Sequence, residues 1–155
     1  MRRLILATTM TALLGACGSP EPSAPAVPVP SPLSDAQRAT ALAALPAPYN
    51  QADLANGEAT FARCRSCHTM AAGGSNMTGP NLYGIIGRVA GTREGYHYST
   101  PLKGAGFAWD QARLDQWLTS PRALVPGTKM SFPGLPDATD RRDVVAYLSV
   151  EAAKR

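Results

Sequence analysis

The residues with the clearest chemistry are Cys64, Cys67 and His68, which stand in the sequence Cys-Arg-Ser-Cys-His. The C-x-x-C-H spacing is the signal for covalent attachment of haem c. Two thiols three positions apart on one turn of chain can both reach the vinyl groups along one side of a porphyrin, and the next residue then places its imidazole beneath the iron. The motif therefore predicts one covalently bound haem c with His68 as an axial ligand.

Two other uses of this cysteine pair fit the sequence less well. A redox disulfide of the thioredoxin type would need alternating strands and helices around it, and that pattern is missing. A structural zinc ion needs four ligands, and only His97 remains to join Cys64, Cys67 and His68. Ligands at the adjacent positions 67 and 68 would also distort the tetrahedral coordination of a zinc ion. We therefore interpret the motif as a haem site.

The second axial ligand of the iron must come from another part of the chain. His97 is the one other histidine in the sequence, and Met70 and Met77 lie too close to His68 to cross easily to the opposite face of the ring. Met130 lies in a loop with proline and glycine, far enough downstream to cover that face. The residues alone leave both Met130 and His97 open as ligands.

The N-terminus has the features of a bacterial export signal. Two arginines precede an apolar stretch at 4–16, which is shorter than the about 20 residues of a membrane-spanning helix. The stretch closes with Leu-Gly-Ala before Cys17, a sequence that resembles a lipobox. We expect 1–16 to be a lipoprotein signal peptide and Cys17 to carry the lipid, anchoring the protein on the periplasmic side of a bacterial membrane. An ordinary signal peptide and an uncleaved anchor are the alternatives.

The residues 17–52 are expected to form a tether between this anchor and a domain at 53–155. Six prolines in the first half of the tether favour extended polyproline II and cannot pack a core. The second half is rich in alanine, and Ser34 with Gln37 forms a capping box that predicts a helix at 34–45. We interpret that helix as a spacer.

Three segments of the domain predict helices that position the haem. The residues 54–63 lead directly into the attachment motif, and 110–118 form a short helix that stops before Pro121. Asp137 is a good N-cap for a third helix near the C-terminus. The apolar stripe of that third helix consists of Val144, Tyr147 and Leu148. We expect this stripe to be core and to cross the first helix near Phe61.

The composition limits the classes of protein to which the chain can belong. Charged residues make up 17% and aromatic residues 6% of the sequence, so an ordinary apolar core must be small. A cofactor at the centre would supply apolar mass. The formal net charge is +4, and the absence of basic runs with interleaved aromatic residues argues against nucleic acid as a partner.

From Gly57 onward the sequence resembles class I cytochromes c of the mitochondrial and alphaproteobacterial type. The matching motifs, in order, are CRSCHT at 64–69, GPNLYG at 79–84, Gly87 with Arg88, Trp109, and PGTKMSF at 126–132. The resemblance implies an all-α class I cytochrome c fold, with short helices wrapped around one covalent haem c. It also implies His/Met ligation of the iron by His68 and Met130, and electron transfer in place of enzymatic turnover.

The same resemblance assigns residues around the haem. Pro80 matches the residue whose carbonyl group accepts a hydrogen bond from the ligand histidine. The residues that match those holding or approaching the haem propionates are Arg88, Tyr98, Trp109 and Thr128; plain packing is the alternative for Tyr98 and Trp109. Phe132 matches the aromatic residue that closes the pocket beside the methionine. Trp117 and Leu102 replace a frequent tyrosine and asparagine, which should alter the tuning of the haem but not its function.

Basic residues around the expected haem edge match a docking surface for acidic redox partners. They are Arg63, Arg122 and Lys129, although for each a merely solvated charge is an equal alternative. The resemblance implies a shuttle between a cytochrome bc complex and a haem–copper oxidase or a similar acceptor. A haem peroxidase or gas sensor, in which Met130 leaves the iron, and a fixed cytochrome subunit of a larger oxidoreductase are the alternatives.

Overall fold

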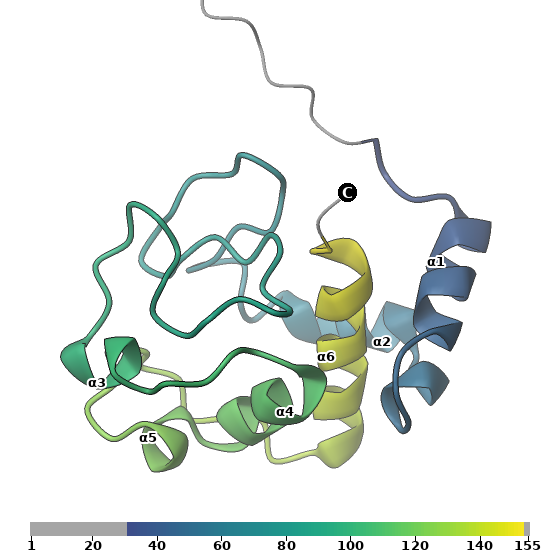
Figure 1. Ribbon diagram of the computed structural model, residues 1–155. Helices are drawn as coiled ribbons and strands as arrows, with labels where there is room; N and C mark the ends of the chain where they lie inside the picture. The colour runs from purple at the N-terminus through teal and green to yellow at the C-terminus, as the bar shows by residue number, and fades with distance from the viewer. Residues whose placement is uncertain (1–30, 154–155) are drawn as a thin grey trace, which may run out of the picture.

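The computed structural model of the chain describes residues 31–153, so the expected signal peptide and Cys17 lie outside the described residues. The elements within this range are α1 (Asp35–Ala43), the 3-10 helix η1 (Tyr49–Gln51), α2 (Leu54–Phe61), α3 (Thr100–Lys103), α4 (Gln111–Thr119), α5 (Pro121–Leu124) and α6 (Ala138–Glu151). Within 31–153 there is no β-strand, only an isolated bridge between Val89 and Ala108. The predicted all-α fold is confirmed (Figure 1).

The helices α2 and α6 cross at the centre of the domain, and close approach of their backbones requires Gly57. A Cβ atom at Gly57 would lie 2.3 Å from the carbonyl oxygen of Asp143. One helical turn further, the rings of Phe61 and Tyr147 pack with centroids 5.7 Å apart. The predicted stripe of Val144, Tyr147 and Leu148 is buried. Its expected crossing of the first helix near Phe61 is therefore confirmed.

The N-cap of α6 was predicted correctly. Asp137 accepts hydrogen bonds from the backbone N–H groups of Thr139 and Asp140, and so satisfies two groups at the start of α6. Asp110, which was expected to be the first residue of a helix, is instead the N-cap of α4, and it accepts from the backbone N–H of Arg113 at 2.6 Å.

The helix α2 ends at Phe61, two residues earlier than the range 54–63 predicted. The chain tightens there into turns, and the backbone N–H of Cys64 donates to the carbonyl oxygen of Phe61 at 2.8 Å. A further bond of 2.9 Å, from the backbone N–H of His68 to the carbonyl oxygen of Cys64, closes the turn that carries the motif. The end of α2 therefore sets the direction in which the two cysteines and the histidine point.

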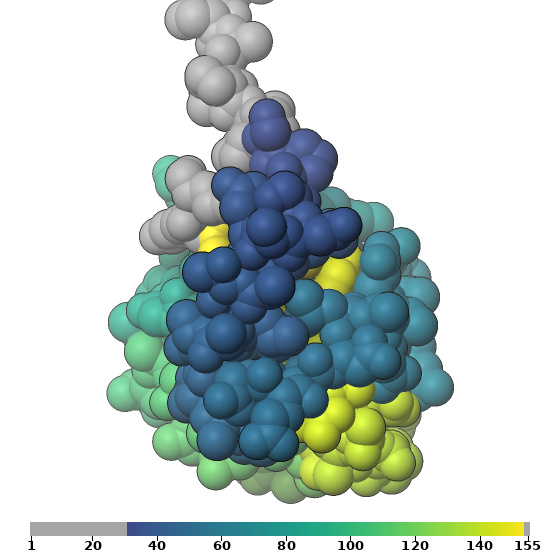
Figure 2. Space-filling model, turned by 90° about the vertical axis from the view of Figure 1, so that its right-hand side faces the viewer, coloured from purple at the N-terminus to yellow at the C-terminus, as the bar shows by residue number. Residues whose placement is uncertain are grey.

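The helix predicted at 34–45 is present as α1, with the expected capping box between Ser34 and Gln37. It does not stand clear of the domain as a spacer would, because Arg38 forms a 2.7 Å ion pair with Glu151 at the end of α6. The following 3-10 helix buries Tyr49. Figure 2 shows this N-terminal segment lying across the face on which α6 appears.

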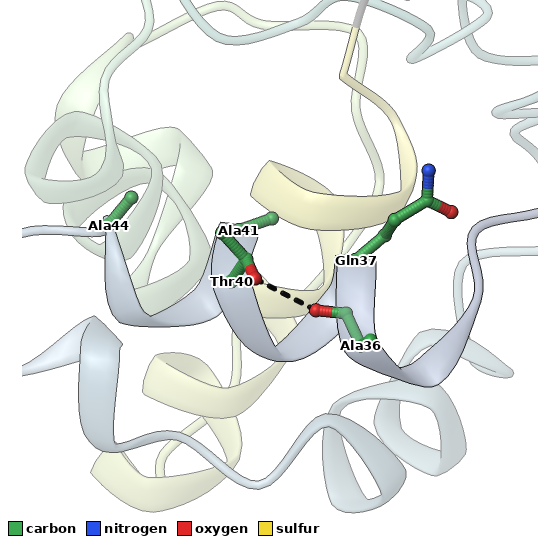
Figure 3. A pocket seen from close by; sticks show the side chains of 5 residues that line it. All are labelled: Ala36, Gln37, Thr40, Ala41 and Ala44. Atoms are coloured by element: carbon green, nitrogen blue, oxygen red, sulfur yellow. Dashed lines mark hydrogen bonds between the residues drawn. The ribbon is translucent and has the colours of Figure 1, made fainter.

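The outer face of α1 carries a shallow groove lined by small and polar side chains. Its residues are Ala36, Gln37, Thr40, Ala41 and Ala44 (Figure 3). The hydroxyl of Thr40 is already used, since it donates to the carbonyl oxygen of Ala36 at 2.9 Å. The groove holds none of the residues with predicted chemistry. Among the described helices, moreover, none is both long and apolar enough to cross a membrane.

Candidate functional site

A cavity of about 350 Å³ lies between the end of α2, the long loops, α4 and α6. Its volume is within the usual range for cofactor and small-molecule sites. The walls are mostly apolar, and they include Leu82, Ile85, Leu102, Leu114, Leu118 and Val144. Val144 and Leu148 were expected to be core alone; both are buried, and both also line the cavity.

The attachment motif forms one wall of this cavity. Cys64, Cys67 and His68 all line it, and the two cysteines form no disulfide with each other. Burial raises the pKa of the Cys64 thiol, and the neighbouring Cys67 raises it further. The backbone N–H of Gly79 donates to the carbonyl oxygen of Cys67 at 2.8 Å, which ties the motif to the loop that follows it.

The imidazole of His68 is held in one orientation by the loop at 79–80. Its Nδ1 lies 2.7 Å from the carbonyl oxygen of Pro80. A carbonyl oxygen only accepts, so Nδ1 carries the proton and Nε2 keeps a free lone pair. A Cβ atom at Gly79 would lie 2.3 Å from Cε1 of the ring, so only glycine leaves room for it. Burial lowers the pKa of His68 against the opposing effect of the Pro80 hydrogen bond, which favours the neutral, metal-binding form.

The loop that contains Met130 supplies another part of the lining. The backbone N–H of Met130 donates to the hydroxyl of Thr128 at 3.3 Å, and both residues line the cavity. Lys129 connects this loop to the loop that contains His97, because its Nζ donates to the carbonyl oxygen of His97 at 3.2 Å. The side chain of His97 is exposed and does not line the cavity. Of the two candidates that the sequence left open, Met130 alone lines the cavity.

Part of the lining is polar. Tyr98 and Trp109 are among the lining residues, and Trp109 packs edge-on against Trp117 with centroids 5.4 Å apart. Ser99 also lines the cavity, and its hydroxyl is buried without a hydrogen-bond partner among the residues 31–153. Sequence reasoning missed Ser99, because nothing in the sequence separates a buried serine from an exposed one. An unpaired buried hydroxyl in the lining of a cavity indicates an acceptor in the bound molecule.

Arg88 lies behind this polar wall and is not one of the residues that line the cavity. Its guanidinium group donates to the carbonyl oxygens of Asn81, at 3.1 Å, and Tyr83. Burial lowers the pKa of Arg88, and the nearby Tyr98 opposes this shift. The arginine is therefore placed to act on the cavity through Tyr98.

The remaining predicted residues fall into two groups. Phe132, Trp117 and Leu102 all line the cavity. Of the docking cations, Arg63 and Lys129 are exposed residues that also line it, whereas Arg122 is exposed on α5 and does not. The lining cations thus lie where the cavity opens to solvent.

The residues 54–150 match the family described as cytochrome c, and this range covers well over half of the chain. The chain belongs to the cytochrome c family. Membership confirms three predictions: the class I cytochrome c fold, one covalently bound haem c, and electron transport as opposed to catalysis.

Similar cytochromes c are found in several bacteria. Cytochrome c2 of Rhodoblastus acidophilus is 45% identical over 93 residues, which cover 60% of this chain and 87% of that protein. The cytochrome c-type cyt cy of Rhodobacter capsulatus is 50% identical over 98 residues, 63% of this chain and 48% of that protein. The solved structure of cytochrome cH from Methylobacterium extorquens has a TM-score of 0.60 and 46% identity, covering 64% of this chain and 99% of that one.

The cavity fits the haem of a cytochrome c. Two thiols and an imidazole with a free Nε2 stand on its lining, an apolar interior surrounds them, and an unpartnered hydroxyl belongs to the same lining. The zinc alternative finds no support in 31–153, where no cluster of three or more histidine, cysteine or acidic residues could hold a metal ion.

Proposed function

We propose that this cytochrome c is a membrane-anchored shuttle of single electrons, with its haem in the cavity described above. In this proposal Cys64 and Cys67 form the two thioether bonds, and His68 and Met130 are the axial ligands of the iron. The observation that carries the proposal is that all four side chains line one cavity, although Met130 comes from a distant segment of the chain.

The haem iron supplies reversible exchange of one electron between its ferric and ferrous states. His68 contributes an imidazole whose ring is fixed by the 2.7 Å contact with Pro80, and this contact increases the basicity of Nε2. Met130 contributes a thioether, which is a weak donor to ferric iron and therefore raises the potential. With His68 and Met130 both bound, no open coordination position is left for a substrate.

The other lining residues exclude water from the haem and provide hydrogen bonds for its charged groups. The apolar side chains exclude water, and this penalises the additional positive charge of the ferric state. Hydrogen-bonding groups are added to this lining by Tyr98, Ser99, Trp109 and Thr128. These groups suit the carboxylates of a haem, because a buried carboxylate without donors is costly.

The proposed partners are a cytochrome bc complex as donor and a haem–copper oxidase or similar acceptor, on the periplasmic side of the membrane. Two observations support this. The relatives include a cytochrome c2 and a cytochrome c-type cyt cy from bacteria. Arg63 and Lys129 are exposed residues that also line the cavity, so acidic partner surfaces would be attracted to the opening beside the haem.

Reversible redox chemistry without ligand uptake tests the carrier function. We expect the purified protein to contain one haem per chain, to titrate as a one-electron couple, and to bind no carbon monoxide in its ferrous form at neutral pH. Uptake of carbon monoxide by the ferrous protein, or peroxidase activity of the native protein, would instead support the open-site alternative.

Membrane attachment is tested by replacing the lipidation residue. We expect the wild-type protein in the membrane fraction and Cys17→Ser in the soluble periplasmic fraction, with the same haem spectrum in both. Membrane-bound Cys17→Ser would contradict a lipid anchor. Isolation in detergent then separates a shuttle from a fixed subunit, because the shuttle is purified alone and the subunit with its complex.

A further inference from the structure

Two arginines, Arg88 and Arg93, lie near the cavity-lining residue Tyr98 and close enough to affect each other. The positive charge of Arg93 lowers the pKa of Arg88, in addition to the larger effect of burial. Within 31–153, neither arginine forms an ion pair with an aspartate or glutamate. Two partly buried cations without a carboxylate between them repel each other, so their arrangement favours a nearby anion.

Arg93 is the less satisfied of the two. Arg88 donates to two backbone carbonyl oxygens, those of Asn81 and Tyr83. The Nε atom of Arg93 is sealed from solvent and has no hydrogen-bond partner among the described residues. A buried donor without an acceptor destabilises the folded protein. Such a donor in a native structure calls for an explanation, and a bound acceptor is one.

Tyr98 connects both arginines to the cavity. It lines the cavity, and the charges of both arginines act on its hydroxyl group. Burial raises the pKa of Tyr98, against the opposing hydrogen bond from Arg93 and the charge of Arg88. The phenol therefore keeps its proton at neutral pH and can donate a hydrogen bond to an acceptor in the cavity.

We infer that Arg93 is a tuning residue that supplies a second positive charge, beside Arg88, to a carboxylate of the haem at the Tyr98 end of the cavity. This charge keeps the carboxylate ionised across the physiological pH range. It also raises the reduction potential of the iron, because a nearby cation disfavours the extra positive charge of the ferric state. The inference rests on the haem site proposed above.

The test is the midpoint potential of the purified holoprotein as a function of pH. We expect Arg93→Gln to have a lower potential than the wild type, with the pH step of its carboxylate moved upward by about one unit. Arg93→Lys should keep the wild-type profile, because it keeps the charge. Lys103→Gln removes an exposed cation at the end of α3 and is the matched control. A profile of Arg93→Gln that equals that of the wild type or of Lys103→Gln overturns the inference.

A second measurement needs no substitution and so is independent of folding defects. In the wild-type holoprotein, a proton NMR titration of the haem carboxylates should show none that titrates above about pH 5. A carboxylate on the Tyr98 side that titrates between about pH 5 and pH 8 overturns the inference. A wild-type protein with neither haem nor His/Met ligation would instead overturn the proposed site itself, so the two failures are distinguishable.

Discussion

The side-chain amide of Asn56 donates a 2.9 Å hydrogen bond to a carboxylate oxygen of Asp143, and this bond joins α2 to α6. Asp143 is only 1% exposed, and its other oxygen accepts from the backbone N–H of Asp53 at 3.1 Å. The guanidinium of Arg142 lies 2.7 Å from the same oxygen. The buried charge is therefore both paired and hydrogen-bonded. Because α2 runs directly into Cys64, this contact helps to fix the attachment motif.

Loss of the Asn56 amide should destabilise the protein. We expect Asn56→Ala to lower the free energy of unfolding by about 1–3 kcal/mol, since a buried carboxylate then loses a donor. Guanidinium unfolding of the holoprotein measures this. Glu58→Ala on the same helix is the control: its exposed pair with Arg65 should contribute less than about 1 kcal/mol. Equal losses in the two variants would contradict this role for Asn56.

A methyl group at Gly57 should force the two central helices apart. Its Cβ would lie 2.3 Å from the carbonyl oxygen of Asp143 and 2.8 Å from Cβ of Tyr147. We expect Gly57→Ala to lower the unfolding free energy by at least about 2 kcal/mol. Gly104→Ala is the matched control, since its nearest contact would be an ordinary 3.6 Å. A Gly57→Ala protein as stable as Gly104→Ala would show that the helices do not approach this closely.

The N-cap of α6 should make the free energy of unfolding depend on pH in the acidic range. Hydrogen bonds from the backbone N–H groups of Asp140 and Thr139 lower the pKa of Asp137 below its usual value of 3.8. A carboxyl group whose pKa is lower in the folded than in the unfolded protein stabilises the fold, and this contribution is complete at pH values above the unfolded pKa. The contribution is lost as the pH falls through the folded pKa. We expect Asp137→Asn to be less stable at neutral pH and to lose less stability on acidification. Parallel stability curves of the two proteins from pH 7 to about pH 2 would rule this out.

The segment before α2 should contribute to the stability of the domain. Tyr49 is 8% exposed, and α1 is tied to α6 by the pair of Arg38 and Glu151. We expect Tyr49→Ala to lower the unfolding free energy by about 3 kcal/mol, while Ala39→Gln, at an exposed position of α1, changes it by less than about 0.5 kcal/mol. If Tyr49→Ala were also neutral, the segment would act only as a tether, as the expected boundary at residue 53 implies.

The sequence predicted the elements whose signals are local and strong. The expected stop before Pro121 is sufficient to place α4 to within one residue, and the N-cap Asp137 with the apolar stripe is sufficient to place α6. The helices α3 and α5 were not predicted, because four residues that begin with Thr-Pro or Pro-Arg show no helical periodicity. They are stabilised by tertiary packing, in which Leu102 and Pro121 are buried.

The candidate site divides in the same way between local and tertiary signals. The C-x-x-C-H motif predicted the haem from one short segment, and family resemblance identified Tyr98, Trp109 and the Met130 loop. Ser99 and Arg93 could not be found in this way. Each has a buried polar side-chain atom without a hydrogen-bond partner, and only the folded chain buries that atom. Lipidation of Cys17 and the domain boundaries stay predictions.

The absorption spectrum of the oxidised holoprotein tests the central claim, ligation of the iron by His68 and Met130, most directly. We expect the wild type to show the weak sulfur-to-iron charge-transfer band in the red, and Met130→Ala to lack it. Met77→Ala is the matched control, because that methionine is 47% exposed and should leave the band unchanged. Persistence of the band in Met130→Ala, or its loss in Met77→Ala, would contradict the proposed ligand.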